Sequence, residues 1–157
     1  MGKITAEEII KDIGEEPICV PPETTVYEAV KLMVDKKSHA VIIIKNGEYV
    51  GIWTEHDLMT STVQEGYDPK ITKVGDHMSY PLKTASYKDN IFQLIDKFLG
   101  KQVRHLLIEK EGKYIGLLYS RYVIRAGFTE RTRQLRELNE MVDLEYYENW
   151  KWRKKNK

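Results

Sequence analysis

The sequence has little of what several protein classes require. Its single cysteine, Cys19, excludes an internal disulfide framework and fits a reducing compartment. No apolar run is long enough to cross a bilayer, and the first residues lack the apolar core of a signal peptide. The formal net charge of +1 gives no general attraction to nucleic acids or anionic membranes. We therefore expect a cytoplasmic protein with no membrane and no nucleic-acid partner.

Motifs of the common enzyme classes are also missing. The sequence has no Walker loop, no Gly-x-Gly-x-x-Gly and no Gly-x-Ser-x-Gly, and no carboxylate pair stands out for acid–base chemistry. The four histidines have no metal-ligand spacing, and the lone cysteine has no second thiol to join it. We expect no enzyme, with no catalytic residues, no metal site and no catalytic cofactor.

The first part of the chain predicts a short helix followed by a compact α+β unit. Thr5 and Glu8 have capping-box spacing ahead of the apolar residues Ile9, Ile10 and Ile13, and a second capping box opens a helix at residues 25–37. The remaining elements are strands at 18–20, 40–44 and 49–54, a hairpin turn at 46–47, and a helix from about residue 57 to 62.

The same unit recurs 65 residues further along. Residues 45–51 align without a gap to residues 110–116, and four of the seven positions are identical. The capping residues of the 25–37 helix recur as Asn90 and Gln93. Its apolar stripe also recurs at the same offset: Val26, Ala29, Val30, Met33 and Val34 correspond to Ile91, Leu94, Ile95, Phe98 and Leu99. A single β-α-β-β-α unit is too small to bury its own sheet, so we expect two tandem units packed face to face around a shared cleft. This is an α+β fold.

The repeat resembles a pair of cystathionine-β-synthase (CBS) domains, a Bateman module. Residues 51–58 are similar to the family's Gly-h-x-Thr/Ser-x-x-Asp/Asn-h element, where h is apolar, and residues 74–78 followed by Pro81 resemble the opening of a second unit. The resemblance covers about residues 9–126. It implies a first repeat at 1–66 including the N-terminal helix, a second repeat at 67–126, and a helical tail at 127–157.

The family resemblance implies a regulatory module that binds an adenosyl ligand, most often AMP, ADP or ATP. In the first strand–helix junction, residues 51–58, the Asp57 carboxylate could accept both ribose hydroxyls, and the helix N-terminus favours a phosphate. The alternative is purely local: Thr54 is then only a helix N-cap and Asp57 only a first-turn acid. In the second junction, residues 116–123, tyrosines replace both groups (Tyr119 and Tyr122), so we expect one nucleotide per chain.

Basic residues of one repeat are expected to face the phosphates of a ligand held by the other. By resemblance these are Arg104, His105 and Arg121, with His39 as the counterpart in the first repeat; the alternative for the two arginines is a solvated surface position. His56 is a further candidate. The complete set of expected ligand-binding residues is Ile52, Thr54, Asp57, Val103, Arg104, His105, Arg121 and His39.

The tail has no glycine or proline after Gly127 and predicts a helix capped by Thr129. Its apolar stripe is Leu135, Leu138 and Val142, widened by Met141 and Leu144. Aromatic residues (Tyr146, Tyr147, Trp150, Trp152) and basic ones (Lys151, Arg153, Lys154, Lys155, Lys157) follow. The tail either packs on a second copy or packs back on its own module.

A homodimer is expected, because apolar helix surfaces such as those of Leu58 and Val123 need a partner. Three functional alternatives stay open. The chain could be a ligand-free interaction module, a regulatory subunit of a separately encoded enzyme or transporter, or a binder of S-adenosylmethionine.

Overall fold

The computed structural model describes residues 3–155, with side chains as far as Met141. The expected features of the tail that lie beyond Met141 therefore fall outside the described side chains. The first half of the chain contains α1 (Ala6–Ile13), β1 (Cys19–Val20), α2 (Val26–Asp35), β2 (Ala40–Lys45), β3 (Glu48–Thr54) and α3 (Glu55–Thr62). The second half contains a 3-10 turn (Val74–Asp76), β4 (Thr84–Ser86), α4 (Ile91–Lys101), β5 (His105–Lys110), β6 (Lys113–Tyr119) and α5 (Ser120–Lys155).

Each repeat is built on a three-stranded sheet. In the order β1-β2-β3 and β4-β5-β6, the first pair of strands is parallel and the second antiparallel. Both hairpins turn through two left-handed residues, Asn46-Gly47 in the first and Glu111-Gly112 in the second. This is the conformation that the Asn-Gly pair favours. The ladder also shifts register at equivalent places, after Ile43 and after Ile108. The α+β fold of two tandem repeats is confirmed.

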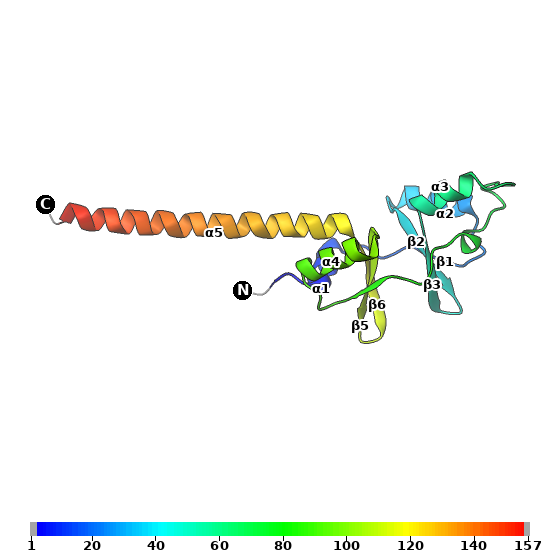
Figure 1. Cartoon of the computed structure of the whole chain (residues 1–157), viewed down its shortest axis with the longest axis horizontal. Coiled ribbons are helices and arrows are strands. Elements are labelled where there is room, and N and C mark those ends of the chain that lie inside the picture. The colour runs from blue at the N-terminus through cyan, green and yellow to red at the C-terminus, as the bar shows by residue number, and fades with distance from the viewer. Residues whose placement is uncertain (1–2, 156–157) are drawn as a thin grey trace.

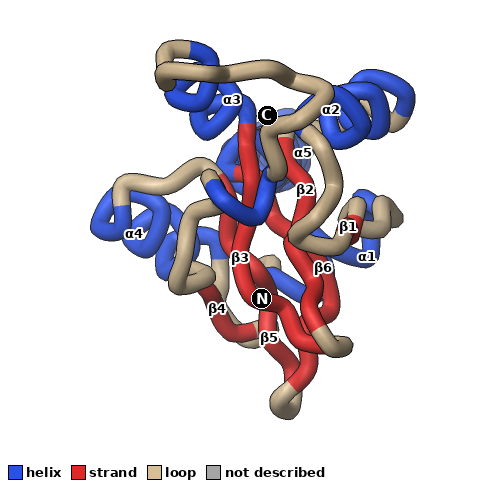
Figure 2. Tube along the Cα trace, turned by 90° about the vertical axis from the view of Figure 1, so that its right-hand side faces the viewer, coloured by secondary structure: helices blue, strands red, loops and turns tan. Residues whose placement is uncertain are grey.

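The two sheets face each other across a shared apolar layer (Figure 2). Ile42 and Leu107 occupy the same place in the two repeats, and both are buried in this layer. At the hairpin ends, the rings of Tyr49 and Tyr114, another equivalent pair, stack with centroids 5.0 Å apart. Each repeat therefore supplies the cover for the other's sheet.

Helix α1 belongs to the core of the second repeat although it precedes the first. Ala6 and Ile9 are buried in one cluster with residues of β4, α4, β5 and β6. The Ala6 amide donates to the Asp89 carbonyl at 2.8 Å. Gly116 lets the helix approach, because a Cβ at this position would lie 2.8 Å from Cδ1 of Ile10. The N-terminal helix thus crosses over to the distant repeat.

The segment between the repeats makes the reciprocal crossing onto the first repeat. Val74 is fully buried in the first repeat's core. A Cβ at Gly51, the counterpart of Gly116, would lie 2.4 Å from Sδ of Met78. The backbone of Ile52 exchanges two hydrogen bonds with that of Ser79. These contacts bring residues 78–83 alongside the first strand–helix junction.

The helical tail starts earlier than expected and is not a separate element. α5 begins at Ser120, directly after β6, and continues without a break to Lys155 (Figure 1). Gly127 lies inside it, and Thr129 is not an N-cap: its hydroxyl donates to the Arg125 carbonyl at 3.0 Å. Beyond the second repeat the helix runs away from the molecule, so it does not pack back on its own module.

Two expectations about apolar surfaces are wrong. Val123 is fully buried in the second core, and Leu58 packs partly buried against the first, so neither forms an exposed face. Val34 and Leu99, expected in the core stripes of α2 and α4, are 69% and 71% exposed. Consecutive residues of a helix lie about 100° apart around its axis, so both side chains fall beyond the edge of the buried face of their helix.

Within residues 3–155, no helix is both long and apolar enough to span a membrane.

Candidate functional site

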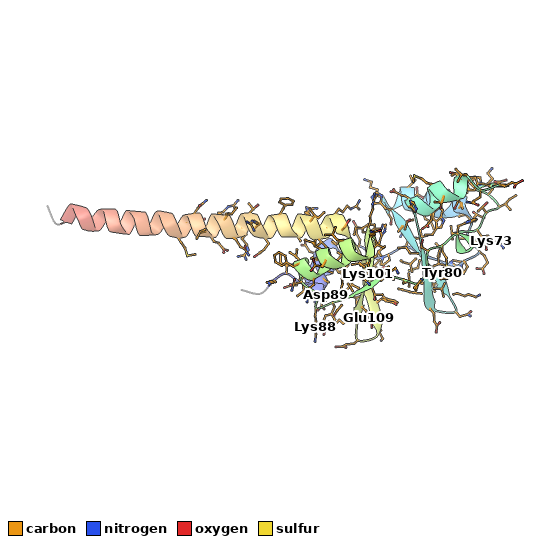
Figure 3. The ribbon with its side chains drawn as sticks, in the orientation of Figure 1. Lys73, Tyr80, Lys88, Asp89, Lys101 and Glu109 are labelled. Atoms are coloured by element: carbon orange, nitrogen blue, oxygen red, sulfur yellow. The ribbon has the colours of Figure 1, made fainter. Side chains whose placement is uncertain are left out.

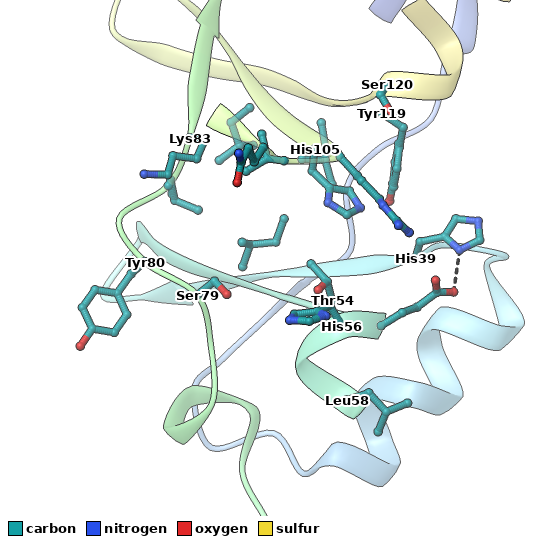
Figure 4. A pocket seen from close by; sticks show the side chains of 18 of the residues that line it. His39, Thr54, His56, Leu58, Ser79, Tyr80, Lys83, His105, Tyr119 and Ser120 are labelled. Carbon is teal, nitrogen blue, oxygen red and sulfur yellow. Dashed lines mark hydrogen bonds and ion pairs between the residues drawn. The ribbon is translucent and has the colours of Figure 1, made fainter. Parts of the chain in front are cut away.

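A cleft of about 1000 Å³ lies where the two strand–helix junctions meet. Figure 4 shows Thr54 and His56 on one wall and His105, Tyr119 and Ser120 on the opposite wall. The walls come from different repeats because the pseudo-symmetric packing of the sheets brings the ends of β3 and β6 together. This volume is in the range of pockets that hold small ligands.

Most of the expected ligand-binding residues line this cleft, although they come from four separate parts of the chain. Seven do so: His39, Ile52, Thr54, Val103, Arg104, His105 and Arg121. Asp57 is the exception, because its side chain is only 6% exposed and does not form part of the lining. His56 lines the cleft as well.

Thr54 and Asp57 hold the start of α3 together. Oδ2 of Asp57 accepts from the Thr54 amide at 2.8 Å and from the Thr54 hydroxyl at 3.0 Å. The Thr54 hydroxyl in turn accepts from the Asp57 amide, which completes a capping box. The capping role that the sequence indicated for Thr54 and Asp57 is therefore present in the structure. These hydrogen bonds hold the Asp57 carboxylate in place at the edge of the cleft.

Ser79 is a site residue that the sequence analysis missed. Its hydroxyl lines the cleft and donates to Oδ1 of Asp57 at 2.9 Å. It arrives on the crossing segment together with Tyr80 and Lys83, which also line the cleft. No local motif marks these positions, because they reach the site only through the packing of residues 74–79 on the first repeat.

The second junction is occupied by aromatic rings. Tyr119 takes the place of Thr54 and is 9% exposed, with its hydroxyl 3.1 Å from that of Ser38. The ring of Tyr122 lies edge-on to it, with centroids 5.8 Å apart. The Tyr122 hydroxyl donates to Glu15. The position equivalent to Asp57 therefore holds Tyr122, a bulky side chain whose hydroxyl is already hydrogen-bonded, instead of a carboxylate.

A chain of polar contacts joins the two repeats at one end of the cleft. Arg121 donates from Nη1 to Nε2 of His39 at 2.6 Å, which leaves Nδ1 of His39 to donate to Glu55 at 2.6 Å. The Arg121 guanidinium also lies 5.0 Å from the centre of the Tyr119 ring. Among the described side chains, Arg104 makes no ion pair and is exposed in the cleft. The cleft thus offers a free guanidinium opposite the first junction.

His105 is held in its neutral form. Burial lowers the pKa of His105 from 6.5 to about 4, and the nearby His39 and Arg104 act in the same direction. An apolar wall formed by Leu107 and Leu117 lies beside it in the cleft. Near neutral pH this side chain therefore contributes hydrogen-bonding groups rather than charge.

We expect the stability of the module to fall as the pH drops from 6.5 toward 4. In this window an unfolded histidine takes up a proton that the folded His105 does not, so acid favours the unfolded state. His105→Gln should remove this part of the pH dependence and reduce the acid-induced drop in melting temperature by roughly 5 °C. Calorimetric melting of both proteins at several pH values measures it. Parallel curves for the two proteins would contradict the prediction.

No group of three or more potential metal ligands is found among the residues that the structure describes. The fold and the site define a two-repeat module with a cleft shared by the repeats, one wall of which carries a capped helix start and the other basic and aromatic groups. The sequence model of the CBS domain matches residues 6–63 and 74–128. The chain belongs to the CBS domain family.

Individual relatives agree with this assignment. The mitochondrial CBS domain-containing protein CBSX3 of Arabidopsis thaliana is 30% identical over 125 residues, which cover 76% of this chain and 61% of that protein. The structure of a protein with CBS domains from Burkholderia ambifaria superposes with a TM-score of 0.75 at 25% identity, covering 80% of this chain and 95% of that one. The chain thus spans about three-fifths of the length of this curated relative.

Two further structures with the same fold contain ligands. CBSX2, solved in complex with AMP, has a TM-score of 0.64 at 24% identity over 81% of this chain and 98% of that one. The CBS domain pair of MJ0100, solved with 5′-methylthioadenosine and S-adenosylmethionine, has a TM-score of 0.70 at 16% identity over 82% of this chain and 99% of that one. At these identities the likeness is one of fold.

Proposed function

We propose that this chain is a regulatory module that binds one adenine nucleotide, AMP-like by preference, in the cleft between its repeats, and that it is not an enzyme. The observation that carries the proposal is the placement of Arg104 opposite the Thr54–Asp57 junction, in a cleft of suitable volume. A ribose held at the junction would direct its phosphate toward this guanidinium and toward the N-terminus of α3. Fold neighbours that bind adenosyl ligands support this ligand class.

In this proposal the ribose replaces Ser79 as a donor to Asp57. The Ser79 hydroxyl already donates to Oδ1 of Asp57 from inside the cleft, which is the type of interaction that a ribose hydroxyl makes. A carboxylate has about four acceptor positions, of which three are in use here. A small rotation of Ser79 would therefore let two hydroxyls reach the buried carboxylate.

The charge of the cleft favours a phosphate over the sulfonium of S-adenosylmethionine. Lys83, Arg104 and Arg121 all line it. The one acidic side chain in the lining, Glu55, is already hydrogen-bonded to His39. A cationic ligand would meet an excess of like charge, whereas an anionic one would be attracted.

The wider role in this proposal is that of a homodimeric sensor. Its target in this proposal is an enzyme or transporter. A single cysteine fits a reducing compartment, so the cytoplasm is the proposed location. Pull-down experiments with and without AMP address the target.

Arg104→Ala is expected to weaken AMP binding by about tenfold and to leave adenosine binding nearly unchanged, because it removes a charge-assisted bond to the phosphate alone. Isothermal titration calorimetry with AMP, ATP, adenosine and S-adenosylmethionine measures this. Lys88→Ala is the control: it also removes one positive charge, but from the outer part of the second repeat (Figure 3). Wild-type protein should bind one equivalent of AMP. The proposal would be refuted if the wild-type protein bound none of these ligands, or if it preferred S-adenosylmethionine.

A further inference from the structure

The family match ends at residue 128, but α5 continues to Lys155. The part beyond the match corresponds to about 40 Å of helix at 1.5 Å per residue. Figure 3 shows that the side chains drawn along this part project into open space around the helix. A single helix without tertiary packing is only marginally stable in water. This length of helix therefore needs packing against a partner to be stable, and the module itself does not supply one.

One face of α5 carries the spacing of a coiled-coil contact line. Large apolar residues stand at Ile124, Phe128, Leu135 and Leu138, separated by steps of four, seven and three, and Arg131 divides the step of seven into three and four. At 100° per residue these five positions fall within about 80° of the helix surface. The four apolar ones are 51%, 72%, 54% and 54% exposed. We refer to these five residues as the α5 stripe.

Apart from Arg131 itself, the charged residues between positions 130 and 140 lie off the stripe. Arg133 bonds to both Glu130 and Glu137 within the same helix, on the face opposite the stripe. Beyond Phe128 the positions that flank the stripe are uncharged (Thr132, Gln134, Asn139 and Met141), and Arg125 flanks it only at the end next to the module. A second α5 could therefore approach along the stripe without like charges meeting at its edges.

We propose that α5 pairs in parallel with α5 of a second copy of this chain along the α5 stripe. The proposal rests on the homodimer of the proposed function and assigns the surface that forms it. A second copy is the matching occupant, because a contact line with heptad spacing is complementary to itself. The parallel orientation follows from Ile124 and Phe128, which lie where α5 still contacts its own module. An antiparallel pair centred on the extension would leave them uncovered.

Arg131 gives the pairing a distinctive feature. In a parallel pair each Arg131 faces the same residue of the other copy, in an otherwise apolar stretch of the stripe. A charged residue at one core position lowers the stability of a coiled coil while it specifies register. Replacing it with leucine should therefore strengthen the dimer, an effect expected only if the stripe contacts a second copy of itself.

Sedimentation equilibrium tests the proposal with four proteins. Leu135→Glu should raise the dimer dissociation constant about a hundredfold or more, and Arg131→Leu should lower it about tenfold or more. Arg136→Ala, on the outer face, should change it less than about threefold. All three positions are exposed, so the module's melting temperature should stay unchanged and show that folding is intact.

Disulfide trapping tests the orientation. In a Cys19→Ser background, Leu138→Cys should form a disulfide-linked dimer under mild oxidation, whereas Arg136→Cys should not. Absence of the Leu138→Cys product overturns the parallel pairing. A dimer that persists in Leu135→Glu overturns this surface but leaves the homodimer in place. A monomeric wild type overturns both, and AMP titration of Leu135→Glu, expected to match wild type within a few-fold, reports on the nucleotide site independently.

Discussion

Asp57→Ala is expected to weaken AMP binding by at least about tenfold. The proposed bond to two ribose hydroxyls is charge-assisted and desolvated, and each such bond contributes about 1.5–3 kcal/mol, while 1.4 kcal/mol corresponds to one factor of ten. The same carboxylate caps α3 through the Thr54 amide, so the free energy of unfolding should also fall by about 1 kcal/mol. Calorimetric titration and thermal melting separate the two effects.

Three control variants isolate the ribose contact. Asp57→Asn keeps the shape of the side chain and loses its charge, so it should retain most of the stability but not the affinity. Ser79→Ala removes the competing donor to Oδ1, so its affinity for AMP should stay equal or rise slightly. Tyr122→Phe alters the equivalent position of the second junction and should change affinity little. Wild-type affinity in both Asp57 variants would exclude the assignment.

The sequence predicted the architecture of each repeat well because those elements depend on local chemistry. Capping boxes, an Asn-Gly turn and β-branched strands are encoded within a few residues of each other. The recurrence at a constant offset then indicated that the two units pack as equivalents. The placement of Arg104 and Arg121 opposite Thr54 was expected from the family resemblance, and the structure brings all three to one cleft.

What the sequence could not reveal depends on contacts between distant segments. The Ser79 bond to Asp57 spans 22 residues and exists only because the crossing segment packs on Gly51. Similarly, Gly127 was expected to separate two helices. A single glycine in a helix costs only about 1 kcal/mol, and α5 continues through Gly127 beside α4, where a Cβ would lie 3.6 Å from Cγ2 of Ile91.

The crossing of α1 is the largest feature of the fold that local patterns left undetermined. Ile9 and Ile13 predicted a buried helix face, but a periodic pattern does not identify the surface that it covers. The structure places this face on the second repeat, more than seventy residues further along the chain. The second repeat therefore cannot complete its core without the N-terminus, and the two repeats depend on each other for stability.

Ile9→Ala is accordingly expected to lower the free energy of unfolding of the whole module by about 2–5 kcal/mol, the usual range for truncating a fully buried isoleucine. Ile9 is 4% exposed and contacts the second core, so its loss leaves a cavity between α1 and the second repeat. Val34→Ala is the matched control, because Val34 is apolar and helical but 69% exposed; its effect should stay within about 0.5 kcal/mol. Chemical denaturation followed by circular dichroism measures both. Equal stability of the two variants would show that α1 is not part of the core, whereas a large loss for Ile9→Ala alone would establish that the segment preceding the first repeat stabilises the second.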